Sequence, residues 1–219
     1  MKNFKLINPI NKKELKKENN KYIDKDGNSF LNISDIPRIN KLKNYTENFG
    51  YQWNQFPETQ LLKKNFVDGL DISTTRLFKV TNWDRNNLGN ISILEAGSGA
   101  GRFSKVILDE TSAVLYSFDS SNAVEANKRN NFTYHNKRFF LTQSDIENIP
   151  YNDNIFDKVI CFGVLQHTQN FYKSIDCLVD KLKPGGEIII DFYPINGFWT
   201  KISAKYILRP LLKRLPDYI

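Results

Sequence analysis

Ile91-Ser-Ile-Leu-Glu-Ala-Gly-Ser-Gly-Ala-Gly-Arg-Phe-Ser104 is the stretch of the chain that says most about its fold. Apolar residues alternate with small or polar ones at its start and predict a short strand over 91–95. Three glycines follow in a turn that has no side-chain bulk, so a ligand can approach the backbone closely. An apolar stripe from Phe103 to Leu108 predicts a helix over 101–110, whose first N–H groups face the same gap. A strand, a glycine turn and a helix in this order indicate a nucleotide-type site.

The spacing of the glycines narrows the kind of nucleotide. Gly97, Gly99 and Gly101 depart from the dinucleotide pattern, because Arg102 stands where its last glycine would be. The charge of Glu95, just before the turn, opposes a pyrophosphate but suits a ligand with an ammonium and a sulfonium group. Asp119 closes a second short strand about 20 residues later, the placement needed to accept both ribose hydroxyls. The combination favours S-adenosylmethionine.

Five separate motifs carry a family resemblance. They read LEAGSGAG at 94–101, FDSS at 118–121, QSDI at 143–146, FDKVI at 156–160 and LKPGG at 182–186. In order and spacing, residues 90–192 resemble the class I S-adenosylmethionine-dependent methyltransferases. The resemblance implies a Rossmann-like α/β fold, S-adenosylmethionine as the cofactor and S-adenosylhomocysteine as the product.

The resemblance also implies roles for particular residues. The methionine end of the cofactor would lie along Glu95, Gly97, Ser98, Gly99 and Gly101, and the ribose would bind Asp119 with Ser120. Asp145 and Ile146 would hold the adenine, and the segment 161–167, with Phe162 and Gly163, would lie near the reacting methyl group.

Composition and length describe a globular protein. The 219 residues, 40% of them hydrophobic, suffice for one sizeable core with a small appendage. Cys161 and Cys177, the two cysteines, lie in apolar surroundings, which argues against a disulfide scaffold. The start of the chain has no apolar leader, and no stretch of about 18 apolar residues predicts a transmembrane segment. We therefore expect a soluble, cytoplasmic protein.

The net charge of +7 comes from the two ends of the chain. Residues 1–50 and 201–219 are basic, whereas 51–200 carry 15 Lys and Arg against 17 Asp and Glu. Solvated surface lysines explain this distribution. A patch that attracts a phosphorylated substrate, nucleic acid or a membrane surface is the alternative.

Residues 1–40 are expected to form a small ribbon-like lead-in. A knuckle at 7–11 precedes a hairpin over 22–33 whose tight turn is Asp26-Gly27, and Ile36-Pro37 is expected to end the unit. The pattern resembles the zinc-ribbon lead-in of some methyltransferases. Asparagines stand where paired cysteines would bind zinc, so we expect no metal here.

Residues 41–90 read as an aromatic and helical lead-in to the core. The cluster of Phe49, Tyr51, Trp53 and Phe56 would either dock the first unit or form a lid over the cofactor. Helices are predicted over 58–70 and 73–81, the second capped by Ser73-Thr74. Arg76 and Trp83 precede the first strand and could reach the cofactor's carboxylate, but we expect them to pack.

Residues 91–219 are assigned to the cofactor-binding domain. Strands over 113–118, 138–142, 156–162 and 186–192 and helices over 121–130 and 171–182 continue the alternation, which specifies a doubly wound, mostly parallel sheet. Residues 184–186 read as the turn that starts the fifth strand. A C-terminal helix is expected over 197–212. Because few residues follow the fifth strand, we expect a family member that is truncated there and has an exposed sheet edge.

Two residues near the expected methyl group are the catalytic candidates. His167 follows the fourth strand and is suited to act as a general base if the acceptor arrives protonated; otherwise it is a loop residue. Gln166 would orient the acceptor, and Asp191 and Tyr193 could touch it. Phosphate-loop, hydrolase and clustered metal-ligand motifs are absent from the sequence.

Three functions fit these patterns. The first is methyl transfer to an O or N atom of a small molecule or a glycan precursor. The second is RNA methylation, which rests on the basic ends alone. The third is a non-catalytic module that binds the cofactor or a partner. The sequence specifies neither the acceptor nor the oligomeric state.

Overall fold

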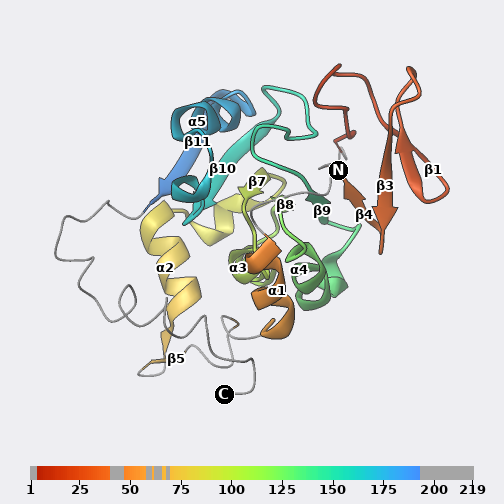
Figure 1. The fold of residues 1–219 in the computed structure, drawn as a ribbon. Coiled ribbons are helices and arrows are strands. Elements are labelled where there is room, and N and C mark those ends of the chain that lie inside the picture. The colour runs from red at the N-terminus through yellow and green to blue at the C-terminus, as the bar shows by residue number, and fades with distance from the viewer. Residues whose placement is uncertain (1–3, 40–46, 58–60, 62–65, 68–69, 193–219) are drawn as a thin grey trace, which may run out of the picture.

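A single mixed sheet organises the chain. The structure, a computed structural model, describes residues 4–39, 47–57, 61, 66–67 and 70–192. In that part of the chain nine strands form one sheet in the order β1-β2-β3-β4-β9-β8-β7-β10-β11. Figure 1 shows the N-terminal strands at one end of the sheet and β11 with α5 at the other.

The second half of the sheet is parallel, as predicted. It contains β7 (Ser92–Ala96), β8 (Val114–Asp119), β9 (Phe139–Gln143), β10 (Phe156–Phe162) and β11 (Leu182–Asp191). β7 lies in the middle, paired with β8 and β10, and all five of its residues are buried. The strand predicted over 91–95 is therefore confirmed, and its polar residues Ser92 and Glu95 are buried with the apolar ones.

Helices cover both faces of this parallel half. The core on one face joins α2 (Ile72–Thr81), α3 (Arg102–Glu110) and α4 (Val124–Asn130) to the sheet through Leu77, Ile107 and Val124. The core on the other face contains Leu178 of α5 (Phe171–Val179) and the aromatic group around Tyr116. The doubly wound α/β prediction is therefore confirmed.

The N-terminal strands extend the same sheet. β1 (Lys16–Glu18), β2 (Lys21–Ile23), β3 (Ser29–Ile33) and β4 (Ile36–Arg38) pair antiparallel in sequence order. Gly27, with φ of 84°, forms the expected turn between β2 and β3. Ile36-Pro37 does not end the unit, contrary to expectation. It lies in β4 because Ile36 is fully buried in the core that contains Phe139 and Leu141, and β4 pairs with β9.

A cluster of Asp24 with Asn8, Asn11 and Asn28 lies at the turn between β2 and β3. The three side-chain amides donate to the Asp24 carboxylate over 2.7–3.0 Å, and the backbone N–H groups of Asp26 and Asn28 donate to it as well. The amide oxygens of Asn8 and Asn11 are also hydrogen-bonded. Each accepts the backbone N–H of the residue two positions later in the chain. We call this group the Asp24 cluster. Because nitrogen donors surround the Asp24 carboxylate, hydrogen bonds hold the Asp24 cluster together.

The lead-in to the core differs from the prediction in one helix. Instead of a helix over 58–70, the described residues there include two short strands, β5 (Phe66–Val67) and β6 (Leu70–Asp71), paired antiparallel. The following helix, α2, forms as predicted, but its cap is Asp71 rather than Ser73-Thr74. The Asp71 carboxylate accepts the Ser73 N–H at 2.9 Å, and a carboxylate at a helix N-terminus satisfies the same orphan donors. α1 (Glu47–Gln55) contains part of the aromatic stretch.

The last strand starts earlier than predicted. β11 begins at Leu182, and the segment 184–186 lies inside it as an irregularity where the register with β10 shifts. Gly185 has a φ of 78°, which fits a local bulge better than a connecting turn. α5 correspondingly ends at Val179 rather than 182. The predicted helix over 197–212 lies outside the described residues. Among the helices that are described, none has the length and apolarity to cross a membrane.

Candidate active site

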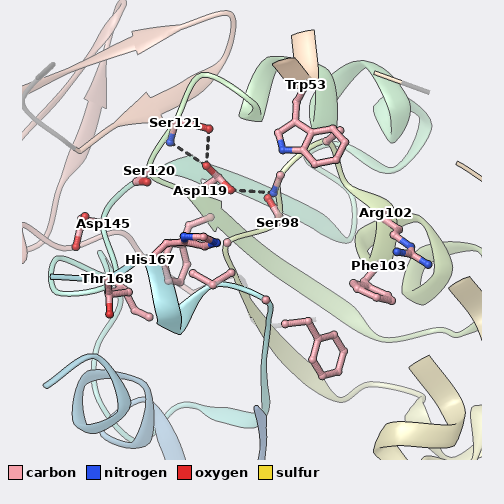
Figure 2. A pocket seen from close by; sticks show the side chains of 18 of the residues that line it. Trp53, Ser98, Arg102, Phe103, Asp119, Ser120, Ser121, Asp145, His167 and Thr168 are labelled. Atoms are coloured by element: carbon pink, nitrogen blue, oxygen red, sulfur yellow. Dashed lines mark hydrogen bonds between the residues drawn. The ribbon is translucent and has the colours of Figure 1, made fainter. Parts of the chain in front are cut away.

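A cavity of about 260 Å³ opens at the carboxyl ends of the parallel strands, the usual ligand site of such sheets. Figure 2 shows side chains from α1, the glycine turn and the ends of β8, β9 and β10 converging on it. The predicted residues that line it are Gly97, Ser98, Gly99, Asp119, Ser120, Asp145, Ile146, Phe162, Gly163 and His167. The sequence thus located the cavity from several separate segments.

The glycine turn is shaped by backbone geometry and close packing. Gly97, Gly99 and Gly101 all have positive φ values, between 52° and 86°. A Cβ atom on Gly97 would lie 2.2 Å from a methyl group of Val164, and one on Gly101 would lie 2.2 Å from Asn127 Oδ1. The N–H groups of Gly97 and Ser98 donate to the carbonyl of Phe118, which ties the turn to the end of β8. Side chains at Gly97 and Gly101 are therefore excluded.

Asp119 joins the glycine turn to the next loop. Its carboxylate accepts the N–H of Gly99 at 2.8 Å, and both the N–H and the hydroxyl of Ser121 at 2.8 and 2.7 Å. Burial raises the pKa of Asp119, although the hydrogen bonds from Ser121 and Gly99 counteract this. The carboxyl group lies in the cavity wall, as Figure 2 shows, and can accept hydrogen bonds from a ligand.

The segments that follow β9 and β10 supply further parts of the cavity lining. Ser144, Asp145 and Ile146 follow β9, and Phe162, Gly163 and Val164 end β10. His167, at the end of the short 3-10 helix Leu165–His167, is exposed and lies with Thr168 at the cavity. Sequence reasoning included Val164 in the segment 161–167 but passed over Ser121 and Ser144 as site residues. Their signal was position alone, because each adjoins a predicted site residue.

A second group of residues at the cavity combines aromatic and guanidinium side chains. It consists of Trp53, Arg76, Arg102 and Phe103. Both guanidinium groups lie over the Phe103 ring, at 5.8 Å for Arg76 and 5.1 Å for Arg102, and Arg76 also pairs with Asp191. Trp83, by contrast, is buried away from the cavity, where its indole N–H donates to Glu187 at 2.9 Å. The sequence left two roles open for Trp53 and for Arg76, and in the structure both residues line the cavity. Trp83 instead packs in the interior of the protein.

Three predicted site residues do not line the cavity. Glu95 is buried behind the glycine turn, where its carboxyl group accepts the hydroxyls of Ser104 and Ser117. Its burial raises the pKa to about 7, against which the two hydroxyls act. Gly101 packs against α4. Gln166 has both amide atoms buried without a hydrogen-bond partner among the described residues.

Asp191 and Tyr193, at the end of the fifth strand, were expected to be able to contact the methyl acceptor. Asp191 lies outside the cavity lining, where it accepts the N–H of Gly163 and pairs with Arg76. It therefore holds two lining residues in place. Tyr193 lies outside the described residues.

An unpartnered polar atom points to a ligand. The hydroxyl oxygen of Ser98 is buried and has no hydrogen-bond partner in the part of the chain that the structure describes. Buried hydroxyls without partners are costly, so a ligand that donates or accepts a hydrogen bond here would remove this penalty. With carboxyl groups at one part of the cavity and guanidinium groups at another, the lining fits a ligand that has both hydroxyl and carboxylate groups.

Comparison with known proteins agrees with this geometry. Residues 94–190 match the family model described as a methyltransferase domain. Together with the sheet order, this match agrees with the predicted resemblance of residues 90–192 to the class I S-adenosylmethionine-dependent methyltransferases.

Individual relatives share part of the chain. It is 31% identical over 144 residues to a tRNA U34 carboxymethyltransferase of Nautilia profundicola, covering 61% of this chain and 47% of that protein. It is 31% identical over 150 residues to a ubiquinone biosynthesis O-methyltransferase of Rickettsia akari, covering 64% of this chain and 56% of that protein. The chain thus spans about half the length of the curated relatives it matches.

A solved structure shows the same fold. It is phosphoethanolamine N-methyltransferase 2 of Haemonchus contortus, in complex with phosphomonomethylethanolamine and S-adenosylhomocysteine. The TM-score is 0.58 at 19% sequence identity, over 79% of this chain and 40% of that one. At this identity the likeness concerns the fold.

Proposed function

We propose that this protein binds S-adenosylmethionine in the cavity and transfers its methyl group to an O or N atom of a small molecule or a glycan precursor. One observation carries the proposal: the glycine turn, the Asp119 carboxyl group and the Asp145–Ile146 pair share one cavity at the carboxyl ends of the strands. A cofactor with a ribose, a base and an amino-acid end requires this combination of groups.

The chain's own residues have separable tasks in this proposal. Asp119 accepts the ribose hydroxyls, and Asp145 with Ile146 holds the adenine. The open backbone of Gly97 and Gly99 and the hydroxyl of Ser98 receive the amino-acid end. Arg76 lines the same cavity, so its guanidinium group is placed to attract the carboxylate at that end.

The chemistry asks mainly for alignment and the exclusion of water. The sulfonium of the cofactor, when bound, supplies a methyl group with a good leaving group already in place. Holding the acceptor in line with it contributes up to about 7–11 kcal/mol to the lowering of the barrier. Trp53 and Phe103 provide apolar surface at the cavity. For an acceptor that arrives protonated, His167 takes up the proton, because it lies at the cavity and is exposed to solvent.

An RNA acceptor is the second candidate. Its support is the basic N-terminal part of the chain, with exposed Lys16, Lys17 and Lys21, and the relative named as a tRNA U34 carboxymethyltransferase. Binding to RNA through phosphates would weaken steeply as salt is raised. A titration with tRNA at two salt concentrations separates this candidate from a small-molecule enzyme. A module that binds the cofactor without catalysis, the third candidate, would bind it and show no turnover.

Calorimetric titration with S-adenosylmethionine, and separately with S-adenosylhomocysteine, tests the proposal. We expect both to bind in the micromolar range and to compete with each other. Release of S-adenosylhomocysteine during incubation with panels of hydroxylated and amine acceptors then identifies the acceptor class. The absence of binding by either ligand to the folded chain would overturn the proposal.

A further inference from the structure

The N-terminal strands reach the wall of the cavity through one buried pair of side chains. Arg38, the last residue of β4, lies directly opposite Gln143, the last residue of β9. The two strands lie beside each other in Figure 1. Both side chains are buried, with 6% of each residue exposed. The pair joins residues that are 105 positions apart in the chain.

Arg38 fixes which way the Gln143 amide points. Its guanidinium donates to Gln143 Oε1 at 2.9 Å and pairs with Glu125 of α4. Because the amide oxygen is held by this donor, the amide nitrogen must face the other way. It donates to the carbonyl of Ser120 at 3.1 Å and to Asn122 Oδ1 at 3.2 Å.

These two acceptors belong to the turn that follows β8. Residues 119–122 form this turn, and Asp119, Ser120 and Ser121 line the cavity. α1 also contacts the turn, because Asn54 Nδ2 donates to the Asn122 carbonyl at 2.8 Å. The turn is therefore hydrogen-bonded both by Gln143 of β9 and by Asn54 of α1, the helix that carries Trp53.

We propose that Arg38 and Gln143 are positioning residues for the cofactor: Arg38 orients the Gln143 amide, and Gln143 holds the 119–122 turn in the conformation that presents Asp119 and Ser120 to the cavity. This inference rests on the proposed cofactor site and extends it, because it makes the N-terminal strands a part of cofactor binding. No residue of β4 touches the cavity, so the effect passes through the turn.

The substitution Gln143→Glu separates positioning from mere anchoring. A glutamate at this position keeps an oxygen acceptor for Arg38 and so keeps β4 attached to β9. It has no N–H donor for Ser120 and Asn122. We expect the melting temperature to change little, and S-adenosylhomocysteine affinity to fall about tenfold, as for the loss of one to two hydrogen bonds. Deuterium uptake by the backbone of residues 119–122 should rise without the ligand.

Glu125→Gln is the matched control. It keeps an oxygen acceptor for Arg38 and removes the negative charge that pairs with the same guanidinium. The one contact of Glu125 with the turn that is described is its backbone N–H to the Asn122 carbonyl, which the substitution keeps. Its ligand affinity should stay within about twofold of the wild-type value, because the Gln143 amide remains oriented. Equal losses of affinity in both variants would show that general attachment of the N-terminal strands, and not the turn, governs binding, and would overturn the proposal.

Asn122→Ala covers the case in which Gln143→Glu fails to fold. Asn122 is exposed, and its removal deletes one of the two acceptors of the Gln143 amide. We expect about a threefold loss of affinity, as for a weak neutral hydrogen bond, and a smaller rise in exchange in the turn. Unchanged affinity and exchange in whichever variants fold would overturn the proposal.

The exchange measurement also keeps the two proposals apart. If the wild-type chain binds neither S-adenosylmethionine nor S-adenosylhomocysteine, the proposed function fails. Exchange in residues 119–122 still decides, without any ligand, whether Gln143 holds the turn.

Discussion

The Asp24 cluster and the region behind the glycine turn each enclose a buried carboxyl group, Asp24 in the first and Glu95 in the second, and the two groups have opposite pKa shifts. Asp24 and Glu95 each expose 4% of their surface. Burial by itself raises the pKa of Asp24, but hydrogen bonds from Asn8, Asn28 and Asn11 outweigh this and hold the pKa well below its usual range. For Glu95, burial has a larger effect than the hydrogen bonds from the hydroxyls of Ser104 and Ser117, which lower the pKa, so the pKa is raised to about 7.

The difference shows what the two regions are built for. Around Asp24 the protein supplies amide and backbone donors to both carboxylate oxygens, so the cluster is complete within itself. Around the glycine turn it supplies fewer donors, and it leaves the Ser98 hydroxyl without a partner among the described residues. A region that satisfies its own polar groups stabilises the fold, whereas one that does not has capacity for a ligand.

The largest effect should follow from opening the Asp24 cluster. Asp24→Ala removes the acceptor for three buried or partly buried amides and two backbone N–H groups, so they lose their partners together. We expect a lower melting temperature and faster deuterium exchange over 7–33. A chelator should leave the wild-type melting temperature unchanged, because the cluster is held by hydrogen bonds.

Asp26→Ala is the control for this variant. Asp26 is exposed and accepts from Lys13 and Asn11 at the surface of the same hairpin. Surface pairs of this kind contribute little to stability. If both variants melted at the same temperature, the Asp24 cluster would not be the anchor of the hairpin.

Glu95→Gln should give the next largest effect, and one that depends on pH. From about pH 4.5 to pH 7 the folded chain keeps the Glu95 proton while the unfolded chain releases it, so the free energy of unfolding decreases as pH rises through this range. Glutamine has no proton to lose. The variant should be more stable than the wild type at pH 8, by up to about 3 kcal/mol, with little difference near pH 4.5.

Denaturant unfolding at pH 5 and pH 8 measures this dependence. Glu110→Gln, an exposed acid on α3, is the control that changes the same kind of residue at the surface. A Glu95→Gln variant that is less stable than the wild type at pH 8 would mean that Glu95 is ionised and well paired, which would remove the contrast with Asp24.

Asp119→Ala should act on binding. Its loss removes the proposed contacts to the ribose and should weaken S-adenosylmethionine binding by about 1.5–3 kcal/mol, the range for hydrogen bonds to a charged group. Calorimetry measures the change, with Asp109→Ala on the exposed end of α3 as the control. An unchanged affinity would place the ribose elsewhere.

His167→Ala should change ligand affinity least. His167 lies at the cavity but is exposed, and its proposed role concerns the proton of the acceptor. We expect cofactor affinity within about twofold of the wild-type value and a turnover that falls by about 100-fold or more if His167 is the base. A complete loss of cofactor binding would give the histidine a structural role.

Local patterns were enough to predict the part of the fold that bears the cavity. The fourteen residues from Ile91 to Ser104 are enough to predict the strand, the turn and the start of the helix. Asp119 ends a strand that periodicity predicts, and Asp145 closely follows another. The errors arose where distant contacts decide. Pro37 reads as a break, but the burial of Ile36 makes this segment a strand. The 184–186 segment reads as a turn before the strand, but it is a bulge inside β11, because Leu182 and Glu187 on either side of it both pair with β10.

The site shows the same limit. Glu95 is adjacent to the turn in the sequence, yet in the strand its side chain points to Ser104 and Ser117, because a β-strand alternates its faces. The pairing of Arg38 with Gln143 leaves no trace in either local sequence, since neither belongs to a pattern that names the other. Composition and spacing therefore predicted the class of ligand more readily than they predicted the contacts that support the site.

The position of Trp53 gives the protein an optical property. The indole is half-buried, and its nitrogen lies 3.6 Å from the point where a Cβ atom on Gly99 would be. A molecule seated on the glycine turn would displace water from this ring and change the wavelength and intensity of its emission. Trp83, buried and bonded to Glu187, would emit as a constant background to that signal. In a Trp199→Phe variant, which keeps Trp53 and Trp83 as its two tryptophans, intrinsic fluorescence can thus follow the filling of the cavity in real time, without a label.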